Sequence, residues 1–316
     1  DMPEINLAVV YFNVITQHET AFHLNVSADE LREFFELQCS RYIRWAEYER
    51  EHRRQRDEAL KRLRFPHAEF RSGQRQLANT VYRAARDGHC LMAQATTGIG
   101  KTLGTLFPQL KAFPEQELDR LFFLTAKTPG RRLALDALAT LRSQEDAMPL
   151  RVLEHVARDK ACEHPDKARH GDPCPLAKGF YDRLPAARKA ALEGQWLSHE
   201  RVREVALAHQ ICPYYLSQEL CRWADVVVCD YNYYFDMGGL LYGLTRLNEW
   251  RVTLLVDEAH NLIERARSMY TAELNQVRFE AVRQIAPRVM KAPLERISRH
   301  WQQLERDQEI AYQVYP

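Results

Sequence analysis

Positions 94–102, QATTGIGKT, combine the residue types that hold a phosphate group. Gly98 and Gly100 let the backbone curl so that successive N–H groups point inward at phosphate oxygens. The lysine that follows supplies a mobile cation, and the threonine after it supplies a hydroxyl ligand for Mg²⁺. The first position of this Walker A pattern, usually glycine, is Ala95. We predict a site for ATP and Mg²⁺ formed by Thr96, Thr97, Gly98, Ile99, Gly100, Lys101 and Thr102.

A second polar group follows a run of apolar residues in LLVDEAHN, at positions 254–261. The run predicts a buried strand, and its polar residues would then lie at the carboxyl edge of a sheet, where ligands bind. Asp257 would hold Mg²⁺, mostly through water, and Glu258 would orient or deprotonate an attacking water. His260 lies too far along the chain for the metal and suits a relay to a neighbouring domain. The residues predicted to act in nucleotide hydrolysis are Lys101, Asp257, Glu258 and His260.

Four of the seven cysteines fall between positions 158 and 223, which suggests a metal site. They contain no C-x-x-C pair, and this spacing disfavours zinc. A 4Fe–4S cluster accepts four thiolates from scattered loops, each bound to a different iron. The candidate ligands are Cys162, Cys174, Cys212 and Cys221. The other cysteines lie on helix and strand patterns and are interpreted as unreactive core thiols: Cys39, Cys90 and Cys229.

Short apolar runs that alternate with helical patterns position these groups. The runs lie at 90–95, 119–128, 224–232 and 251–260, and the first leads into the phosphate loop. This alternation predicts an α/β fold with a parallel sheet covered by helices on both faces. The cysteine-bearing interval 158–222 has few strand-like runs and is interpreted as a mostly helical insertion.

The first 65 residues have a different pattern. Residues 5–16 and 20–26 are rich in β-branched and aromatic side chains, which predicts a hairpin or a pair of edge strands. Ser27 begins SADE, a capping box with Glu30 that predicts a long helix to about residue 64. We interpret the charge-rich second half of this helix as a solvated surface with i,i+4 ion pairs rather than a DNA-binding patch. Region 1–65 is expected to be the remnant of an upstream domain.

Composition limits the possible partners and compartments. Lys and Arg total 44 against 43 Asp and Glu, so any surface that binds nucleic acid must be local. No stretch approaches the roughly 20 apolar residues that span a bilayer, and the first residues lack the basic segment of a secretory signal. We expect a soluble cytoplasmic protein with reduced thiols and no membrane partner.

The motifs ATTGIGKT, TAKT (125–128) and DEAH resemble those of superfamily 2 helicases. The cysteine insertion between the first and last of them is similar to that of the XPD/DinG-like, iron–sulfur branch. CPYYLS and WADVVVCDYNYYFD, within 212–236, resemble the segment after that branch's last cluster cysteine. The resemblance covers about residues 70–270 and extends to the bacterial DinG-like subgroup, in which a nuclease-like domain precedes the helicase. It implies a cytoplasmic, nucleoid-associated protein.

The resemblance implies roles for further residues. It makes Gln74 the residue that reads adenine, and it makes Thr125, Lys127 and Thr128 the contacts to the backbone of the translocated strand. A lysine with two hydroxyls at a strand's carboxyl end is also a reasonable phosphate contact by itself. The DYNYYF segment offers three tyrosines that either stack on single-stranded bases or pack within the protein: Tyr231, Tyr233 and Tyr234.

The family's cysteine pattern is only partly matched. Cys162, Cys174 and Cys212 take the first, third and fourth places, but the second place is held by Arg169, which cannot ligate iron. Cys221 lies where the family does not ordinarily have a ligand, and it would serve only after a loop rearrangement. Two nearby histidines are further possible ligands: His164 and His170. A cluster-type site is expected, and its occupancy is left open.

The resemblance implies an ATP-dependent DNA helicase that moves 5′→3′ on single-stranded DNA and unwinds forked duplexes in repair or replication. The RecA-like first motor domain would comprise 66–157 and 223–268, with the iron–sulfur insertion at 158–222 and the start of a helical Arch domain at 269–316. No motif of a second motor domain follows, so this chain is expected to be part of a longer protein and nearly inactive alone. An ATP-binding clamp on nucleic acid, without unwinding, is the alternative. A nuclease formed by the first 65 residues finds little support, because no (D/E)-x-K triplet follows the predicted strands.

Overall fold

The computed structural model of the 316-residue chain describes residues 3–14, 16–96, 98–144, 148–170 and 174–307, without the side chains of 168–170 and 304–307. The chain divides into two compact units, Asp1–Ile263 and Glu264–Pro316. None of the helices within the described residues is both long enough and apolar enough to cross a membrane.

A five-stranded parallel sheet organises the first unit, and its strand order is β5-β4-β6-β3-β7. The strands are β3 (Arg120–Leu124), β4 (Val152–Glu154), β5 (Trp196–Leu197), β6 (Val226–Cys229) and β7 (Val252–Val256). Leu124 pairs with Cys229 on one side and with Val256 on the other, so the three strands end together. The residues that follow them therefore meet at one carboxyl edge, and the predicted α/β class is confirmed.

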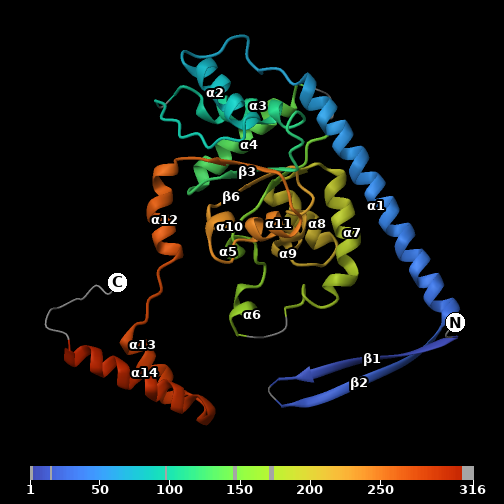
Figure 1. Ribbon diagram of the computed structural model, residues 1–316, viewed down its shortest axis with the longest axis vertical. Helices are drawn as coiled ribbons and strands as arrows, with labels where there is room; N and C mark the ends of the chain where they lie inside the picture. The colour runs from blue at the N-terminus through green and yellow to red at the C-terminus, as the bar shows by residue number, and fades with distance from the viewer. Residues whose placement is uncertain (1–2, 15, 97, 145–147, 171–173, 308–316) are drawn as a thin grey trace. The chain divides into compact units, whose positions relative to one another are not determined.

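The main core lies against one face of this sheet. Leu121 and Phe123 of β3, with Val226 and Val228 of β6, pack in one cluster with three helices. Two of these are α3 (Lys101–Ala112) and α4 (Thr128–Arg142), and the third is the end of α1 (Ala28–Arg62). In Figure 1, α2 (Gln74–Arg86), α3 and α4 lie above β3 and β6, and α8 to α11 lie below. The helices therefore cover both faces of the sheet, as the alternating pattern predicts.

The prediction of a strand at 90–95 is wrong. These residues form no strand, Met92 is 92% exposed and Cys90 is exposed rather than a core thiol. The sheet ends at β7, whose residues are only half-buried and whose outer edge pairs with no described segment. Residues 90–95 do not add to that open edge, and they pair with no strand among the described residues.

The N-terminal hairpin and helix follow the prediction. β1 (Glu4–Asn13) and β2 (His18–Ser27) pair antiparallel along their whole length. At the start of α1, the Ser27 hydroxyl accepts the Glu30 N–H at 3.3 Å and the Glu30 carboxylate accepts the Ser27 N–H at 2.9 Å. Both bonds of the capping box are present, so the local sequence specifies where the helix begins.

The second half of α1 is not the solvated helix that its charges suggest. His52 and Arg56 are buried, and each lies 2.9 Å from a carboxylate oxygen of the buried Asp225. The fully buried Arg151 reaches back to Glu49 at 2.8 Å. These partners lie more than a hundred residues away in the sequence, so an ion-pair network docks α1 on the sheet domain.

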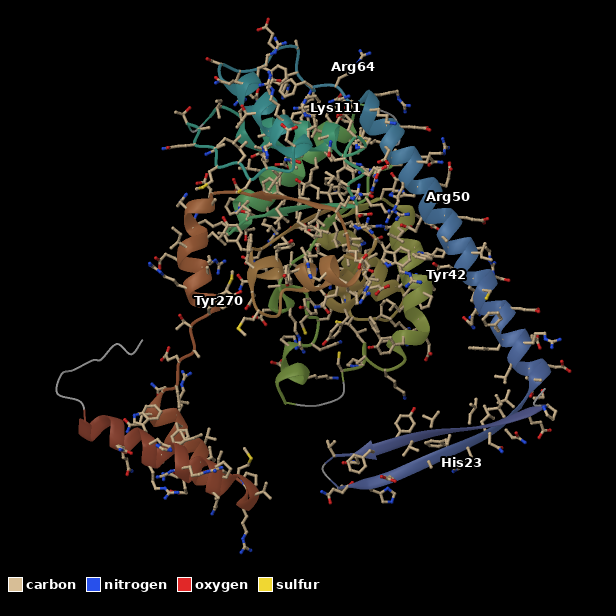
Figure 2. The ribbon with its side chains drawn as sticks, in the orientation of Figure 1. His23, Tyr42, Arg50, Arg64, Lys111 and Tyr270 are labelled. Atoms are coloured by element: carbon tan, nitrogen blue, oxygen red, sulfur yellow. The ribbon has the colours of Figure 1, made fainter. Side chains whose placement is uncertain are left out.

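The far end of α1 is held by packing and by one charged hydrogen bond. Leu60 and Leu63 belong to the main core, and Lys111 Nζ donates to the Lys61 carbonyl at 2.5 Å. Figure 2 labels Lys111 close to Arg64, just beyond the end of α1. A lysine that donates to the last turn of a helix also interacts favourably with the helix dipole. The C-terminus of α1 is thereby fixed to α3.

The cysteine-bearing interval is mostly helical, as predicted. Its helices are α5 (Arg158–Ala161), α6 (Pro165–His170), α7 (Phe180–Glu193), α8 (His199–Ala208) and α9 (Pro213–Leu220). The sequence pattern missed β5, a strand of two residues that lies in this interval and pairs with β4. The interval is therefore joined to the sheet through β5 rather than separate from it.

After β6 come α10 (Asn232–Phe235) and α11 (Leu240–Leu247), and after β7 come a 3₁₀ turn, η1 (Ala259–Asn261), and α12 (Leu262–Met269). The second unit contains α13 (Gln276–Ile285) and α14 (Arg288–Asp307). Phe279 and Trp301 stack between these two helices with ring centroids 5.9 Å apart. The described residues after β7 contain no strand, as the polar helical pattern predicts.

Candidate functional site

The phosphate loop ends at the first residue of α3. Gly98 has φ 88° and Gly100 has φ 82°, both in the left-handed region that favours glycine. A Cβ on Gly100 would overlap the side-chain nitrogen of Gln74. Gly100 is the N-cap of α3, so the positive end of the helix dipole faces the loop, where it can stabilise an anion.

Other predicted loop residues lie at different depths. Thr96 is exposed, Ile99 and Thr102 are half-buried, and Thr97 lies outside the described residues. Lys101 begins α3, and its ammonium lies 3.5 Å from the Ala95 carbonyl. The chain thus folds back across the loop and brings its first and last residues together.

Gln74 and Arg71 support the loop from α2 and the turn before it. Gln74 is 3% exposed and donates from Nε2 to the Gly100 carbonyl at 3.0 Å, while its Oε1 accepts the Arg71 N–H. The Arg71 guanidinium donates to the Gly98 carbonyl at 2.7 Å. Both ends of the Gln74 amide are used within the protein, so its observed role is to hold the loop. Its contact with adenine stays a prediction.

The DEAH residues continue from the end of β7. The Asp257 N–H donates to the Leu124 carbonyl at 2.9 Å, which extends the pairing with β3 by one residue. Glu258 then adopts a left-handed conformation, φ 51° and ψ 49°, before η1. For a residue other than glycine this costs of order 1–3 kcal/mol, and such residues occur often at functional sites.

The phosphate loop and the DEAH residues meet at the carboxyl edge of the sheet. Lys101 Nζ lies 3.4 Å from Glu258 Oε1, and His260 Nδ1 lies 3.4 Å from Glu258 Oε2. Burial raises the pKa of Asp257 above its ordinary value, and the neighbouring Glu258 raises it further. A cation brought to this edge would lower that pKa again, because it favours the charged carboxylate. The edge thus combines one ammonium with two carboxylates.

Thr125 and Gly130 lie beside Asp257 at the end of β3. The Thr125 hydroxyl is 3.4 Å from Asp257 Oδ2, and Thr125 is only 4% exposed. A Cβ on Gly130 would overlap the Thr125 hydroxyl and lie 2.7 Å from the Asp257 carboxylate. Thr125 therefore faces the Asp257 carboxylate at the sheet edge. It does not face solvent, where a contact to the backbone of a DNA strand would lie. Gly130 was not predicted from the sequence. Its position after TAKTP, at the start of a helix, is the signal that could have indicated a close approach of the backbone to the Asp257 side chain.

Two of the three residues predicted to contact the DNA strand are accessible to solvent. Lys127 and Thr128 are exposed at the start of α4, and Lys160 Nζ lies 3.2 Å from the Thr128 hydroxyl. Lys160 precedes the first candidate cysteine and was not predicted. A hydroxyl flanked by ammonium groups suits a phosphate contact.

The three tyrosines of DYNYYF are all used within the protein. Tyr231 is fully buried, and its hydroxyl donates to the Asp257 carbonyl and lies 3.1 Å from the Glu258 carbonyl. Tyr233 donates to the Val156 carbonyl at 3.1 Å and its ring contacts His155, with centroids 4.2 Å apart. Tyr234 packs near Phe122 and Tyr242. These contacts support packing, the alternative to base stacking that the sequence left open.

Three of the four candidate cluster ligands lie together. Cys212 is the N-cap of α9, and Cys162 ends α5, which packs against α9. Burial raises the pKa of Cys212, the N–H groups at the start of α9 lower it, and the nearby Cys174 and Cys162 thiols raise it further. A bidentate ion pair between Glu163 and Arg203, at 2.6 and 2.8 Å, fixes the chain next to Cys162.

Cys221, the doubtful fourth ligand, lies apart from the other three candidates. It is fully buried, its Sγ donates to the Ser217 carbonyl at 3.4 Å, and it lies near Cys229 rather than the other three. Burial raises its pKa far above the ordinary value, which disfavours the thiolate a metal needs. Cys229 is buried as predicted, whereas Cys39 is only half-buried.

The three neighbouring cysteines form no close single-ion site within the described part of the chain. No three His, Cys, Asp or Glu side chains among the described residues lie close enough to hold one metal ion. Cluster ligands lie further apart than this because each binds a different iron. The role of Cys162, Cys174 and Cys212 as cluster ligands stays a prediction. The backbone of Arg169 and His170 lies in α6, but their side chains are outside the described residues.

Comparison with known proteins identifies similar sequences. A segment of the XPD subunit of a general transcription and DNA repair factor from Dictyostelium discoideum is 34% identical over 77 residues, 24% of this chain and 9% of that protein. The Fanconi anemia group J protein homolog of Gallus gallus is 23% identical over 161 residues, 45% of this chain and 12% of that protein. The matched regions thus span a small part of the length of these relatives.

Among solved structures, one titled XPD helicase aligns with a TM-score of 0.49 and 18% identity, over 75% of this chain and 41% of that one. The DEAD_2 family model matches residues 116–279, which include the cysteine insertion and the DEAH residues. Because this match covers more than half of the sequence, the chain belongs to the DEAD_2 family.

Proposed function

We propose that this chain is the nucleotide-binding part of an ATP-dependent DNA helicase of the XPD/DinG type. The single observation that carries the proposal is the meeting of the phosphate loop with the DEAH residues, where Lys101 Nζ lies 3.4 Å from Glu258 Oε1. Family membership and the curated relatives support it, since one of them is titled a helicase subunit. The activity of a whole helicase is a proposal for this chain.

The residues at the sheet edge have distinct roles in this proposal. The loop N–H groups and Lys101 bind the phosphates, and Thr102 and Asp257 would hold Mg²⁺, which neutralises phosphate charge when it is bound. Glu258 orients or deprotonates the attacking water. Its carboxylate contacts the Lys101 ammonium in this structure, so an incoming phosphate competes with Glu258 for the same cation. His260 is 73% exposed and is free to contact a neighbouring domain.

Single-stranded DNA would contact the exposed end of the loop after β3. Lys127 and Thr128 provide a cation and a hydroxyl there, and the adjacent Lys160 adds a second cation. Contacts of this kind are sequence-independent, as a translocating enzyme requires. The 5′→3′ polarity and a preference for forked DNA are proposed from the family resemblance alone.

The cysteine interval would hold an iron–sulfur cluster through Cys162, Cys174 and Cys212. These three thiols are free among the described residues, and the proposal assigns no fourth ligand. Such a cluster would tie α5, α9 and the loop before α7 together. The domain division proposed with it is a RecA-like motor in two parts, 66–157 and 223–268, a cluster domain at 158–222 and the start of an Arch domain at 269–316.

DNA-stimulated ATP hydrolysis tests the proposal. We expect single-stranded DNA to raise the hydrolysis rate of a protein that contains this chain and a second motor domain. Lys101→Ala should abolish that stimulation while DNA affinity, measured by fluorescence anisotropy, changes less than twofold. Lys127→Ala should weaken DNA binding. It should also reduce the magnitude of the slope of log affinity against log salt concentration by about 0.7, the contribution of one phosphate contact on a single strand.

Two results would redirect the proposal. ATP binding without DNA-stimulated hydrolysis, and with DNA affinity intact in Lys101→Ala, would favour the clamp alternative. The absence of any ATP binding would exclude both the motor and the clamp.

A further inference from the structure

Tyr231 links two strands that are not neighbours in the sheet. It follows β6, and β3 lies between β6 and β7. Two strand spacings, about 9.6 Å, therefore separate β6 from β7. The Tyr231 side chain is fully buried and crosses the end of β3, where its hydroxyl donates to the Asp257 carbonyl and lies 3.1 Å from the Glu258 carbonyl.

The peptide between Asp257 and Glu258 is held at both of its polar groups. Its carbonyl accepts the Tyr231 hydroxyl, and its N–H faces the Asp257 carboxylate. The preceding N–H is bonded to β3, through the Leu124 carbonyl. A rotation of this peptide would turn both carboxylates away from their present directions, because they lie on its two ends.

The bond to Tyr231 matters because Glu258 is held in an unfavourable conformation. Its left-handed backbone angles persist only where surrounding contacts determine them. The Glu258 carbonyl also accepts the Asn261 N–H at 2.9 Å and the Asn261 side-chain nitrogen at 3.1 Å. The Asp257 carbonyl, in contrast, has Tyr231 as its donor. The hydroxyl is thus placed to fix the one peptide on which both carboxylates depend.

We propose that the Tyr231 hydroxyl is a positioning group for nucleotide hydrolysis, which holds the Asp257–Glu258 peptide so that the metal-binding and water-activating carboxylates point at the nucleotide together. The inference rests on the proposed function, since it assumes that these carboxylates act on ATP. It also gives the DYNYYF segment a role that base stacking does not.

Hydrogen exchange tests the proposal without relying on activity. Tyr231→Phe keeps the ring and removes only the hydroxyl, so the fold should remain while amides 257–261 exchange about tenfold faster, the effect of one lost buried hydrogen bond. Tyr82→Phe is the matched control. Tyr82 lies on α2, and its hydroxyl donates to Glu115 at 2.5 Å. Removing this hydroxyl should leave the exchange of amides 257–261 unchanged.

Single-turnover ATP hydrolysis, by a protein that contains this chain and a second motor domain and is in excess over ATP, gives the second measurement. Tyr231→Phe should lower the rate constant about tenfold, while the protein concentration at half-saturation changes less than twofold. A merely structural role would lower the melting temperature and change both parameters together. Tyr231→Ala, which also removes the ring, should lower the melting temperature as well.

The outcomes distinguish this inference from the proposed function. Unchanged exchange at 257–261 in Tyr231→Phe would overturn the positioning role, whatever the activity. An unchanged rate constant, in a protein whose hydrolysis is lost in Glu258→Gln, would also overturn it. If Glu258→Gln, in the protein with the second motor domain, hydrolyses ATP as fast as the same protein without the substitution, the proposed function fails instead.

Discussion

The buried carboxylate of Asp225 provides a quantitative prediction about how α1 is attached. It is 1% exposed and accepts hydrogen bonds from His52 at 2.9 Å, Arg56 at 2.9 Å and the Arg151 N–H at 2.8 Å. Removing one partner of a buried ion pair costs about 3–5 kcal/mol, because the remaining charge stays buried without compensation. Asn keeps the shape and one acceptor, so Asp225→Asn should cost about 3 kcal/mol, at the low end of that range.

Thermal unfolding measures this cost. For a unit of this size, about 3 kcal/mol corresponds to a fall of roughly 6–12 °C in melting temperature. Trp223 and Trp45 of α1 pack edge to face with centroids 5.9 Å apart, so tryptophan fluorescence reports on the same contact. Glu58→Gln is the control on the same helix. It removes an exposed pair with Arg54, at 2.7 Å, and should cost less than about 0.5 kcal/mol.

The pH dependence has a definite sign. Burial by itself would raise the pKa of Asp225, but His52 and Arg56 outweigh it and hold the pKa well below its ordinary value. A carboxylate with a depressed pKa in the folded state stabilises the fold above its unfolded pKa of about 3.9, and this stability is lost as the pH falls. The difference between the unchanged chain and Asp225→Asn should therefore shrink as the pH falls below about 4. A melting temperature within 2 °C of the unchanged chain, or an equal loss in Glu58→Gln, would refute this network as the attachment of α1.

Three further predictions concern single positions. Gly130→Ala should weaken Mg²⁺-dependent binding of a fluorescent ATP analogue at least tenfold, because the new Cβ displaces the Asp257 carboxylate, and unchanged binding would contradict the close approach. Cys212→Ser should remove most of the iron from anaerobically purified protein whereas Cys221→Ser should not, and equal iron loss in both would contradict the three-thiol assignment. Ser27→Ala should cost about 1 kcal/mol in the first turn of α1, measured as faster amide exchange there, and unchanged exchange would count against the capping box.

Local sequence patterns predicted the elements whose causes are local. The capping box at Ser27, the helix that begins at Lys101 and the strand before Asp257 all depend on residues within a few positions of one another. The phosphate loop and the DEAH residues also meet, as their motifs predict, but not through a strand before the loop, since residues 90–95 form none and the start of α3 brings Lys101 to the edge. Those parts of the fold and site could be derived from spacing and residue type.

Features that depend on distant partners could not be derived in this way. The charges of α1 predict a solvated helix. In the structure, however, His52 and Arg56 are buried because they pair with Asp225, which lies 169 residues after Arg56 in the sequence. Residues 90–95 have a strand's composition, but composition does not specify pairing, and these residues do not pair with the open edge of β7. Tyr231 lies in an aromatic pattern that suits packing or stacking equally, and its role depends on the strand order.

Nucleotide binding tests the central claim most directly. Titration of the chain with a fluorescent ATP analogue, with and without Mg²⁺, should show one site whose affinity rises with Mg²⁺ and falls at least tenfold in Lys101→Ala. Equal binding by the unchanged chain and Lys101→Ala, or no binding by either, would contradict the assignment of the phosphate loop and the DEAH residues as a nucleotide site.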